Sequence, residues 1–266
     1  LCGIPAEDRK DFFEWTNTMM FNQDPEMAIS EEQAQLASIN VITYAMKLAE
    51  EHKKNPKNDI IGALLNGKGK EAGLSDDEFV WFFLMLIAAG NESTRTVTSH
   101  GMRLLMEHPE QLQYLVDHPE KIPDACEEML RYNTAFILMR RTAMEDVEVA
   151  GHTIRKGDKV ILHYHTVNHD ERLFGEDSMK FDVRRAERIP DLYNQHRAFG
   201  IGQHFCLGTH LARLELRVIL EEVIPRLRNP RLAGEIRYTR SSLVNGIKSM
   251  PITFDPELKR AAVEAA

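Results

Sequence analysis

A ten-residue run near the end of the chain constrains its fold and chemistry more than any other stretch. Phe199–Gly208 reads FGIGQHFCLG and places Cys206 among glycines and aromatic residues. The three glycines permit left-handed or very tight turns and a close approach of the backbone to a flat ligand. A patterned helical stretch follows directly, and the amide groups at the start of a helix stabilise a thiolate. The run therefore predicts a thiolate presented on a glycine-rich loop.

The spacing F-G-x-G-x-H-x-C-x-G resembles the cysteine-ligand loop of the haem-thiolate monooxygenases, the cytochrome P-450 superfamily. This resemblance implies that Cys206 is the axial ligand of a haem b iron and that His204 holds a haem propionate. It also implies that the loop backbone contacts the cofactor at Phe199, Gly200, Gly202 and Gly208. The residues alone leave one alternative open, a buried structural cysteine in a glycine-rich turn.

Size, charge and cysteine content narrow the class of protein. A chain of 266 residues can bury the core of one large domain or of two smaller ones. Its 33 basic and 41 acidic side chains give a net charge of −8, which favours neither nucleic acid nor an anionic membrane as a partner. Three cysteines far apart in the sequence do not form a disulfide framework, so a reducing cytoplasm is the expected compartment.

The apolar runs and the first residues bear on membrane insertion and on length. The longest apolar run, 79–89, falls short of the roughly 20 residues that a spanning helix needs. A soluble protein without a membrane span is therefore expected. The chain begins at Leu1 without methionine, and in the family a segment like 3–9 lies well inside the sequence. The resemblance thus implies that the N-terminal part is missing.

Apolar spacing and helix-start signals predict a mainly helical N-terminal half. Helices are expected over 6–22 and, from a Ser30-x-x-Gln33 capping box, as far as Lys54. A short helix is expected over 59–66. A second capping box, Ser75-x-x-Glu78, predicts a long helix that ends near His108. The first half of that helix is apolar all round, which predicts its burial.

Polar residues interrupt this long helix at 88–94, where they are costly to bury unless they are satisfied or used. The segment resembles the oxygen-binding groove in the family's central helix. The resemblance implies that Ala89 and Gly90 lie against the cofactor and that Glu92, Ser93 and Thr94 deliver protons. Ser93 stands where the family usually has threonine, so the hydroxyl is kept and the methyl is lost. A polar kink lined by water is the alternative.

Glu128 and Arg131 are three residues apart on one predicted helical face. Such a pair is common on any exposed helix, but here it lies upstream of the cysteine loop, in the order that the family shows. The resemblance adds Arg185 as the third member of a structural, non-catalytic ion-pair group.

Residues 135–165 change to an alternating, strand-like pattern around the turns at Gly151 and 156–158. Alignment with the family on its glycines implies that Arg141 bonds a haem propionate. The family often has proline at the position of Ala135, and its absence leaves the local chain path open.

His163 and His165 support a competing interpretation. If both lie on one strand they share a face, as in the metal motif of cupins, with Glu171 as a nearby acid. No later strand supplies the remaining histidine of that motif, so a solvated strand end is the favoured alternative.

Together these features predict a mainly α protein with small β-sheets, the cytochrome P-450 fold, in a single domain over 1–266, and the stretch 243–252 is expected to close it as a hairpin. The resemblance implies insertion of one oxygen atom from O2 into a C–H bond. It also implies ferredoxin and ferredoxin reductase as electron donors and a hydrophobic substrate such as a steroid or lipid. A non-catalytic haem protein of the same fold and the cupin-like metal enzyme are the alternatives.

Overall fold

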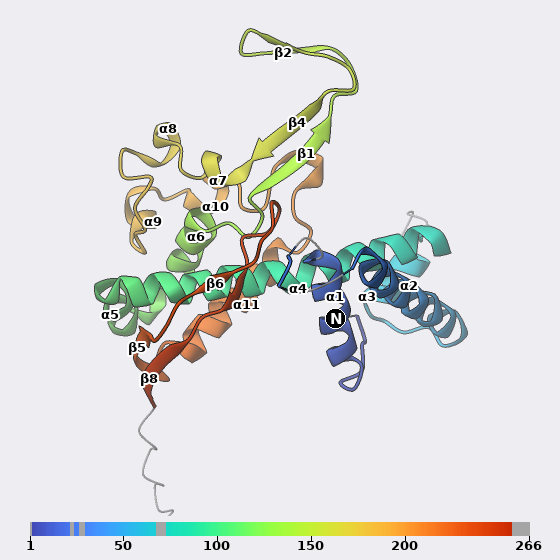
Figure 1. Cartoon of the computed structure of the whole chain (residues 1–266), viewed down its shortest axis with the longest axis horizontal. Coiled ribbons are helices and arrows are strands. Elements are labelled where there is room, and N and C mark those ends of the chain that lie inside the picture. Colours follow the sequence, from blue (N-terminus) through green and yellow to red (C-terminus); the bar gives the residue numbers. More distant parts are fainter. Residues whose placement is uncertain (1, 22–23, 27–29, 68–72, 257–266) are drawn as a thin grey trace, which may run out of the picture. The chain divides into compact units, whose positions relative to one another are not determined.

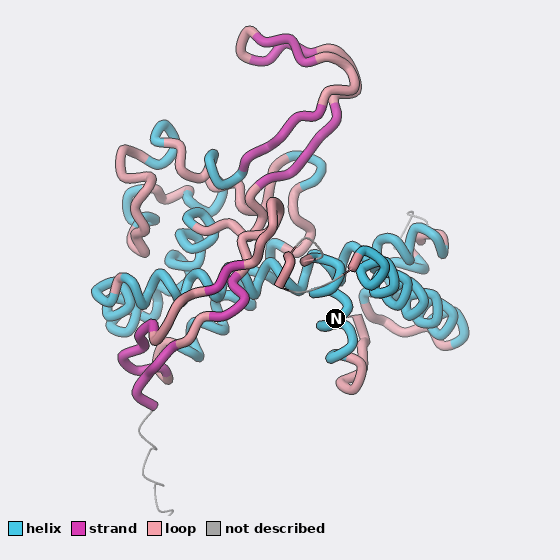
Figure 2. Tube along the Cα trace, in the orientation of Figure 1, coloured by secondary structure: helices cyan, strands magenta, loops and turns pink. Residues whose placement is uncertain are grey.

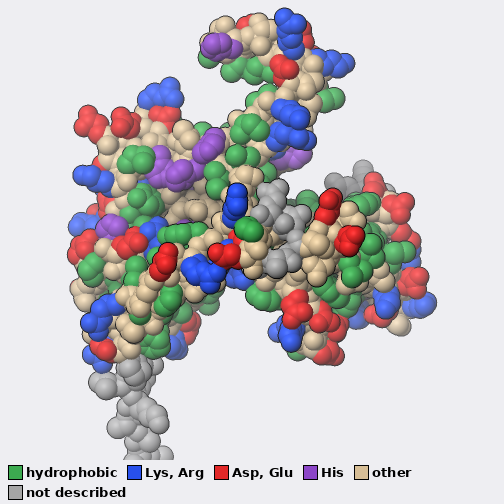
Figure 3. All heavy atoms as spheres, in the orientation of Figure 1, with side chains coloured by type: hydrophobic (Ala, Val, Ile, Leu, Met, Phe, Trp, Pro, Cys, Tyr) green, Lys and Arg blue, Asp and Glu red, His purple; other side chains and the backbone are tan. Residues whose placement is uncertain are grey.

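The computed structural model describes residues 2–21, 24–26, 30–67 and 73–256. The chain divides into two compact units, 1–92 and 93–266, and the division falls within the long helix α4 (Asp76–Glu107). Helices dominate, and the strands form short, separate pairs (Figures 1 and 2). On the face shown in Figure 3, acidic and basic side chains are interspersed rather than gathered into one field. Within the described ranges, no helix is long and apolar enough to cross a membrane.

The first unit consists of helices, most of which begin at a side chain that caps them. It contains α1 (Arg9–Met20), α2 (Glu31–Lys54), α3 (Ile60–Asn66) and the first half of α4. Both predicted capping boxes form. Ser30 Oγ accepts from the Gln33 N–H at 3.2 Å while Gln33 Oε1 accepts from the Ser30 N–H at 3.0 Å. The two helix starts predicted from capping boxes are therefore confirmed, whereas the helix expected from residue 6 begins at Arg9.

Aromatic and aliphatic side chains fill the core of the first unit. Phe12 meets Tyr44 edge-on at 4.8 Å and lies 6.2 Å from Phe83, measured between ring centroids. The expectation that the first half of α4 is wholly buried was wrong. Its Phe83 face packs into this core, while Trp81 and Met85 are 64% and 50% exposed.

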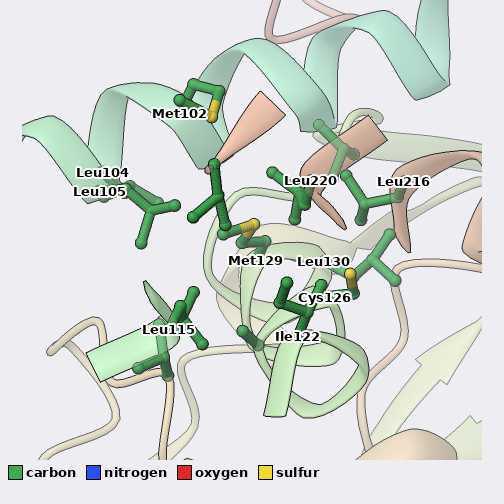
Figure 4. Close-up of a cluster of buried hydrophobic side chains, with 14 of the residues drawn as sticks. Met102, Leu104, Leu105, Leu115, Ile122, Cys126, Met129, Leu130, Leu216 and Leu220 are labelled. Atoms are coloured by element: carbon green, nitrogen blue, oxygen red, sulfur yellow. The ribbon is translucent and has the colours of Figure 1, made fainter. Parts of the chain in front are cut away.

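The core of the second unit lies between helices that are distant in sequence (Figure 4). Apolar side chains from α4, α5 (Pro109–Asp117), α6 (Ile122–Tyr132) and α11 (Thr209–Val223) meet there. Gly101 permits the approach of α4 to α6, because a Cβ at that position would lie 2.5 Å from Met129 Sδ. The helix loses about 1 kcal/mol of propensity by carrying glycine there, and the close packing offsets that loss.

Short elements connect these helices. They are η1 (Pro119–Lys121), α7 (Tyr164–Val167), α8 (Glu171–Phe174), α9 (Arg185–Arg188), α10 (Leu192–Gln195) and η2 (Gly202–His204).

In the described part of the second unit, the strands form four antiparallel two-stranded pairs. The pairs are β1 (Leu138–Thr142) with β4 (Lys159–His163), β2 (Val147–Val149) with β3 (His152–Ile154), β5 (Leu227–Leu232) with β8 (Ile252–Pro256) and β6 (Arg237–Tyr238) with β7 (Ile247–Ser249). The strands predicted around Gly151 and 156–158 are confirmed. The predicted hairpin over 243–252 was wrong, because β7 and β8 each pair with an earlier strand instead of with each other.

The chain path at Ala135 is fixed by hydrogen bonds to the tail. Ala135 is buried, and its carbonyl accepts from the Asn245 N–H at 2.9 Å. Phe136 forms a β-bridge with Val244 next to this bond. Proline is therefore not needed to hold the path of this stretch.

Candidate functional site

The cysteine loop lies in the second unit between α10 and α11 and is closed on itself by backbone hydrogen bonds. Cys206 N–H donates to the Phe199 carbonyl at 2.9 Å, and Phe205 N–H donates to the Gly202 carbonyl at 3.0 Å. Gly200 and Gly202 have φ angles of +75° and +74°, the left-handed region that glycine adopts without strain. A Cβ at Gly200 would also lie 3.2 Å from Tyr164 Oη, so the loop packs closely on α7.

The Cys206 thiol is half-buried at the start of α11, as the sequence predicts for its position. Burial raises the pKa of the Cys206 thiol, while a hydrogen bond from the Gly208 N–H and the positive charge of Arg213 act in the opposite direction. Three apolar side chains of the same loop, those of Ile201, Phe205 and Leu207, are exposed. The loop therefore presents one half-buried sulfur with a backbone donor, and it also carries exposed apolar side chains.

A cavity of about 440 Å³ lies beside this loop. Its walls include Tyr193, Phe199, Phe205 and Arg213. Cys206 is not among the residues that line this cavity.

The polar segment of α4 spans the division between the two units. Ala89, Gly90 and Glu92 belong to the first unit, and Ser93 and Thr94 belong to the second. Ala89 and Gly90 are exposed, and a Cβ at Gly90 would meet no atom within 4 Å. Glu92 is buried, at 3% exposure. The helix is continuous through this segment, so the predicted polar residues lie on α4 without a break.

Glu128, Arg131 and Arg185 are brought together and are fully buried. Arg131 donates to both carboxylate oxygens of Glu128 at 2.7 and 2.8 Å, and Arg185 Nε lies 3.0 and 3.1 Å from the same two oxygens. The two guanidinium groups also donate to the carbonyl oxygens of five surrounding positions: Asn168, Phe174, Asp177, Ser178 and Lys180. The Glu128 carboxylate and the two guanidinium groups together thus join α6 to several positions between 168 and 185.

Two further residues expected to hold a ligand lie on separate elements of the second unit. Arg141 is in β1, opposite Val160 of β4, and its Nη1 donates to the Arg140 carbonyl at 3.0 Å. His204 ends the short helix η2 and is exposed.

The geometry that a cupin-like metal site needs is absent. Strand β4 ends at His163, and His165 lies in helix α7, so the two residues do not share a strand face. His163 Nδ1 instead accepts from the Thr166 N–H at 3.2 Å and caps that helix. Across the described part of the chain, no three metal-ligating side chains are grouped to hold an ion. The cupin interpretation was therefore wrong.

The sequence did not predict a group of three charged and polar residues beside the cysteine loop. Glu127 is buried and contacts His196 and Arg213, which lie before and after the loop. Their separations from Glu127 are 69 and 86 residues. Local spacing carries no signal for such contacts, although a second acid beside Glu128 was visible.

Comparison with known proteins found a matching family model and proteins of similar sequence. A model of the family described as cytochrome P450 matches residues 122–230. The steroid C26-monooxygenase of Rhodococcus jostii (strain RHA1) is 38% identical over 96% of this chain and 52% of that protein. The methyl-branched lipid omega-hydroxylase of Mycobacterium tuberculosis (strain ATCC 25618 / H37Rv) is 35% identical over 96% of this chain and 58% of that protein.

The fold of the chain is also similar to that of a solved structure. CYP109E1 from Bacillus megaterium in complex with testosterone superposes with a TM-score of 0.84 at 31% identity, covering 96% of this chain and 68% of that one. The chain spans about half the length of the curated relatives that it matches.

Proposed function

Because the chain belongs to the cytochrome P450 family, we propose that it acts as a haem-thiolate monooxygenase on a hydrophobic substrate. In this proposal the whole chain, 1–266, serves as one domain, and one oxygen atom from O2 enters a C–H bond. The observation that carries the proposal is the loop that presents the half-buried Cys206 thiol next to a backbone donor.

The residues of the loop fit a haem. A flat apolar macrocycle needs a cysteine ligand and apolar surface to cover, and Cys206 shares its loop with the exposed Ile201, Phe205 and Leu207. The left-handed glycines keep side chains away from the approach of such a group. Haem with a thiolate ligand supplies electron density that favours O–O cleavage.

The proposal gives each of the candidate site residues a distinct role. Cys206 holds the iron. Arg141 and His204 supply positive or hydrogen-bonding groups for the two propionates. On α4, Ala89 and Gly90 leave room against the helix backbone. The buried carboxyl of Glu92 and the hydroxyls of Ser93 and Thr94 hold and pass protons, since all three side chains can donate and accept them.

The proposed substrate is suggested by the names of two relatives, and the proposed electron donors are those that the family resemblance implies. Two relatives are named for oxidising a steroid at C26 and a methyl-branched lipid at its omega end. From these two names we infer that the substrate of this chain is a steroid or a branched lipid, which is oxidised at a terminal carbon. Electrons are expected from a ferredoxin and its reductase.

The carbon monoxide difference spectrum of the reduced, haem-loaded protein tests the ligand. We expect a strongly red-shifted Soret band from thiolate ligation. Cys206→Ser should move this band to the ordinary position, whereas Cys126→Ser, which alters the buried cysteine of α6, should leave it in place. A red-shifted band that survives in Cys206→Ser would exclude Cys206 as the ligand.

A non-catalytic haem protein of the same fold is the second candidate, and Ser93 in place of the family's usual threonine favours it. Product formation separates the two. With ferredoxin, reductase and a steroid that carries a branched side chain, the monooxygenase consumes one O2, two electrons and two protons for each molecule of hydroxylated product, and the second oxygen atom leaves as water. A haem protein without turnover keeps the red-shifted band but forms no product, and Ser93→Thr then shows whether the missing methyl is responsible.

A further inference from the structure

Two neighbouring carboxylates on α6 serve two different buried networks. Glu127 and Glu128 are adjacent, so their side chains leave the helix about 100° apart. Glu128 binds Arg131 and Arg185, as described above. Glu127 is also buried, but its partners are His196 and Arg213, which flank the cysteine loop.

The Glu127 carboxylate is held on both of its oxygens. Arg213 donates from Nε to Oε1 at 2.8 Å and from Nη2 to Oε2 at 2.9 Å, the bidentate fork that a guanidinium forms with a carboxylate. His196 Nε2 lies 2.9 Å from Oε2. His196 Nδ1 accepts a hydrogen bond from the Ala198 N–H at 3.3 Å. A neutral His196 ring therefore carries its proton on Nε2, and this N–H donates a hydrogen bond to Glu127.

Arg213 connects this carboxylate to the aromatic rings that flank the loop. Its Cζ lies 3.5 Å from the ring centroid of Tyr193 and 4.6 Å from that of Phe199. Arg213 Nη2 also donates to the Tyr193 carbonyl at 3.1 Å. Phe199 is the first residue of the loop, and its carbonyl accepts the Cys206 N–H at 2.9 Å. An unbroken series of contacts therefore runs from Glu127 through Arg213 and Phe199 to the Cys206 backbone.

We propose that Glu127, His196 and Arg213 are positioning residues that fix Phe199 and thereby hold Cys206 in the orientation that its ligand role requires. We call this set the Glu127 network. The inference rests on the proposed function for the role of Cys206. The same α6 helix thus holds the 168–185 stretch through Glu128 and the cysteine loop through Glu127.

Burial and charge support the assignment. Burial alone would raise the pKa of Glu127, but hydrogen bonds from His196 and Arg213 outweigh it, and the pKa is lowered. Glu127 is therefore ionised at neutral pH and keeps the Arg213 fork intact. Removal of one partner leaves a buried charge without its match, which loosens the contacts that depend on it.

The first test measures Cys206 in the haem-free protein. The main variant is Arg213→Lys, which keeps the positive charge near the thiol but loses the fork and the planar group between the rings. The control is Leu220→Ala, a fully buried position of the same helix that belongs to the apolar core. The rate of iodoacetamide alkylation is followed at Cys206 by peptide mass spectrometry, with the buried Cys126 as the internal reference.

We expect Arg213→Lys to speed alkylation of Cys206 relative to Cys126 by about fivefold or more, the effect of losing roughly one stabilising contact on a local opening. Leu220→Ala should lower thermal stability without this selective increase. His196→Gln, whose amide N–H can still reach Glu127, should behave like the wild type, whereas His196→Ala should resemble Arg213→Lys. If Arg213→Lys does not fold, the two His196 variants make the same comparison.

The second test uses the haem-loaded protein. At a temperature where all variants are folded, Arg213→Lys and His196→Ala should move part of the carbon monoxide Soret band to the ordinary position. Leu220→Ala should not. Equal alkylation ratios and equal spectra for Arg213→Lys and Leu220→Ala would overturn the positioning role. If the wild type itself lacks the red-shifted band, the proposed function fails, and the alkylation ratio still decides whether the network positions Cys206.

Discussion

At the scale of single residues, His100 is the clearest source of pH-dependent stability. It is buried on α4, where its Nε2 lies 2.7 Å from the Asn245 carbonyl and its Nδ1 accepts from Arg103 Nε at 3.4 Å. Burial lowers the pKa of His100 from 6.5 to about 4, so the folded protein keeps this ring neutral. The unfolded chain takes up a proton at higher pH than the folded chain does.

Stability from His100 is therefore complete above about pH 6.5 and is lost as the pH falls toward 4. Between pH 7 and pH 5 the expected loss is about 2 kcal/mol of unfolding free energy. Urea unfolding at the two pH values measures it in the wild type and in His100→Gln, where this share of the pH dependence should disappear. The exposed His152→Gln is the control. An unchanged pH dependence in His100→Gln would show that the ring is not the source.

The position of Cys206 on a glycine-rich loop just before a helix was predictable, because a local pattern marks it. The protonation of the thiol was not predictable. The helix N-terminus favours a thiolate, but burial of the side chain outweighs it and the pKa is raised. Glu127 and Arg213 were missed because they meet across 86 residues, and the fork between them depends on how α6 and α11 pack.

At the scale of elements, the start of α4 depends on its capping box. Ser75 Oγ accepts from the Glu78 N–H at 3.3 Å, and Glu78 Oε2 accepts from the Ser75 N–H at 2.9 Å. Ser75→Ala should lower the free energy of unfolding by about 1 kcal/mol, because it leaves helix N–H groups without an acceptor. Ser75→Asp restores an acceptor and should stay within a few tenths of a kcal/mol of the wild type. Urea unfolding curves compare the three, and equal losses in both variants would contradict a capping role.

Helix limits were predictable because capping and proline act within a few residues. Helix α2 ends at Lys54 as expected, and α4 ends one residue before the predicted limit. Strand partners were not predictable. β7 pairs with β6 (Arg237–Tyr238), and β8 pairs with β5 (Leu227–Leu232). This pairing depends on where the preceding chain lies and not on the sequence of the strands themselves. The apolar first half of α4 likewise said nothing about which face would be covered.

At the scale of the whole molecule, the order of motifs predicted the fold class, and the structural comparison supports it at a TM-score of 0.84. What the sequence could not supply was the way one side chain joins many segments. Glu128 was predicted as part of an ion-pair group, but Arg131 and Arg185 also bind carbonyl oxygens from Asn168 to Lys180. Those acceptors are backbone groups, which no residue pattern marks.

Because these contacts depend on one carboxylate, the stability of the second unit depends strongly on Glu128. Glu128→Gln removes the carboxylate shared by two guanidinium groups that are 0% exposed. Arg131 is left with an uncompensated charge, while Arg185 keeps the Asp177 carboxylate at 3.1 Å as its remaining partner. Breaking a buried pair in this way costs about 3–5 kcal/mol, a large share of the stability of a typical domain. We expect Glu128→Gln to lose hydrogen-exchange protection first in the 168–185 stretch. The control is Glu187→Gln, which breaks an exposed pair with Arg184 and should cost about 1 kcal/mol or less. Equal, small losses in the two variants would mean that the backbone carbonyl oxygens alone satisfy the buried guanidinium groups.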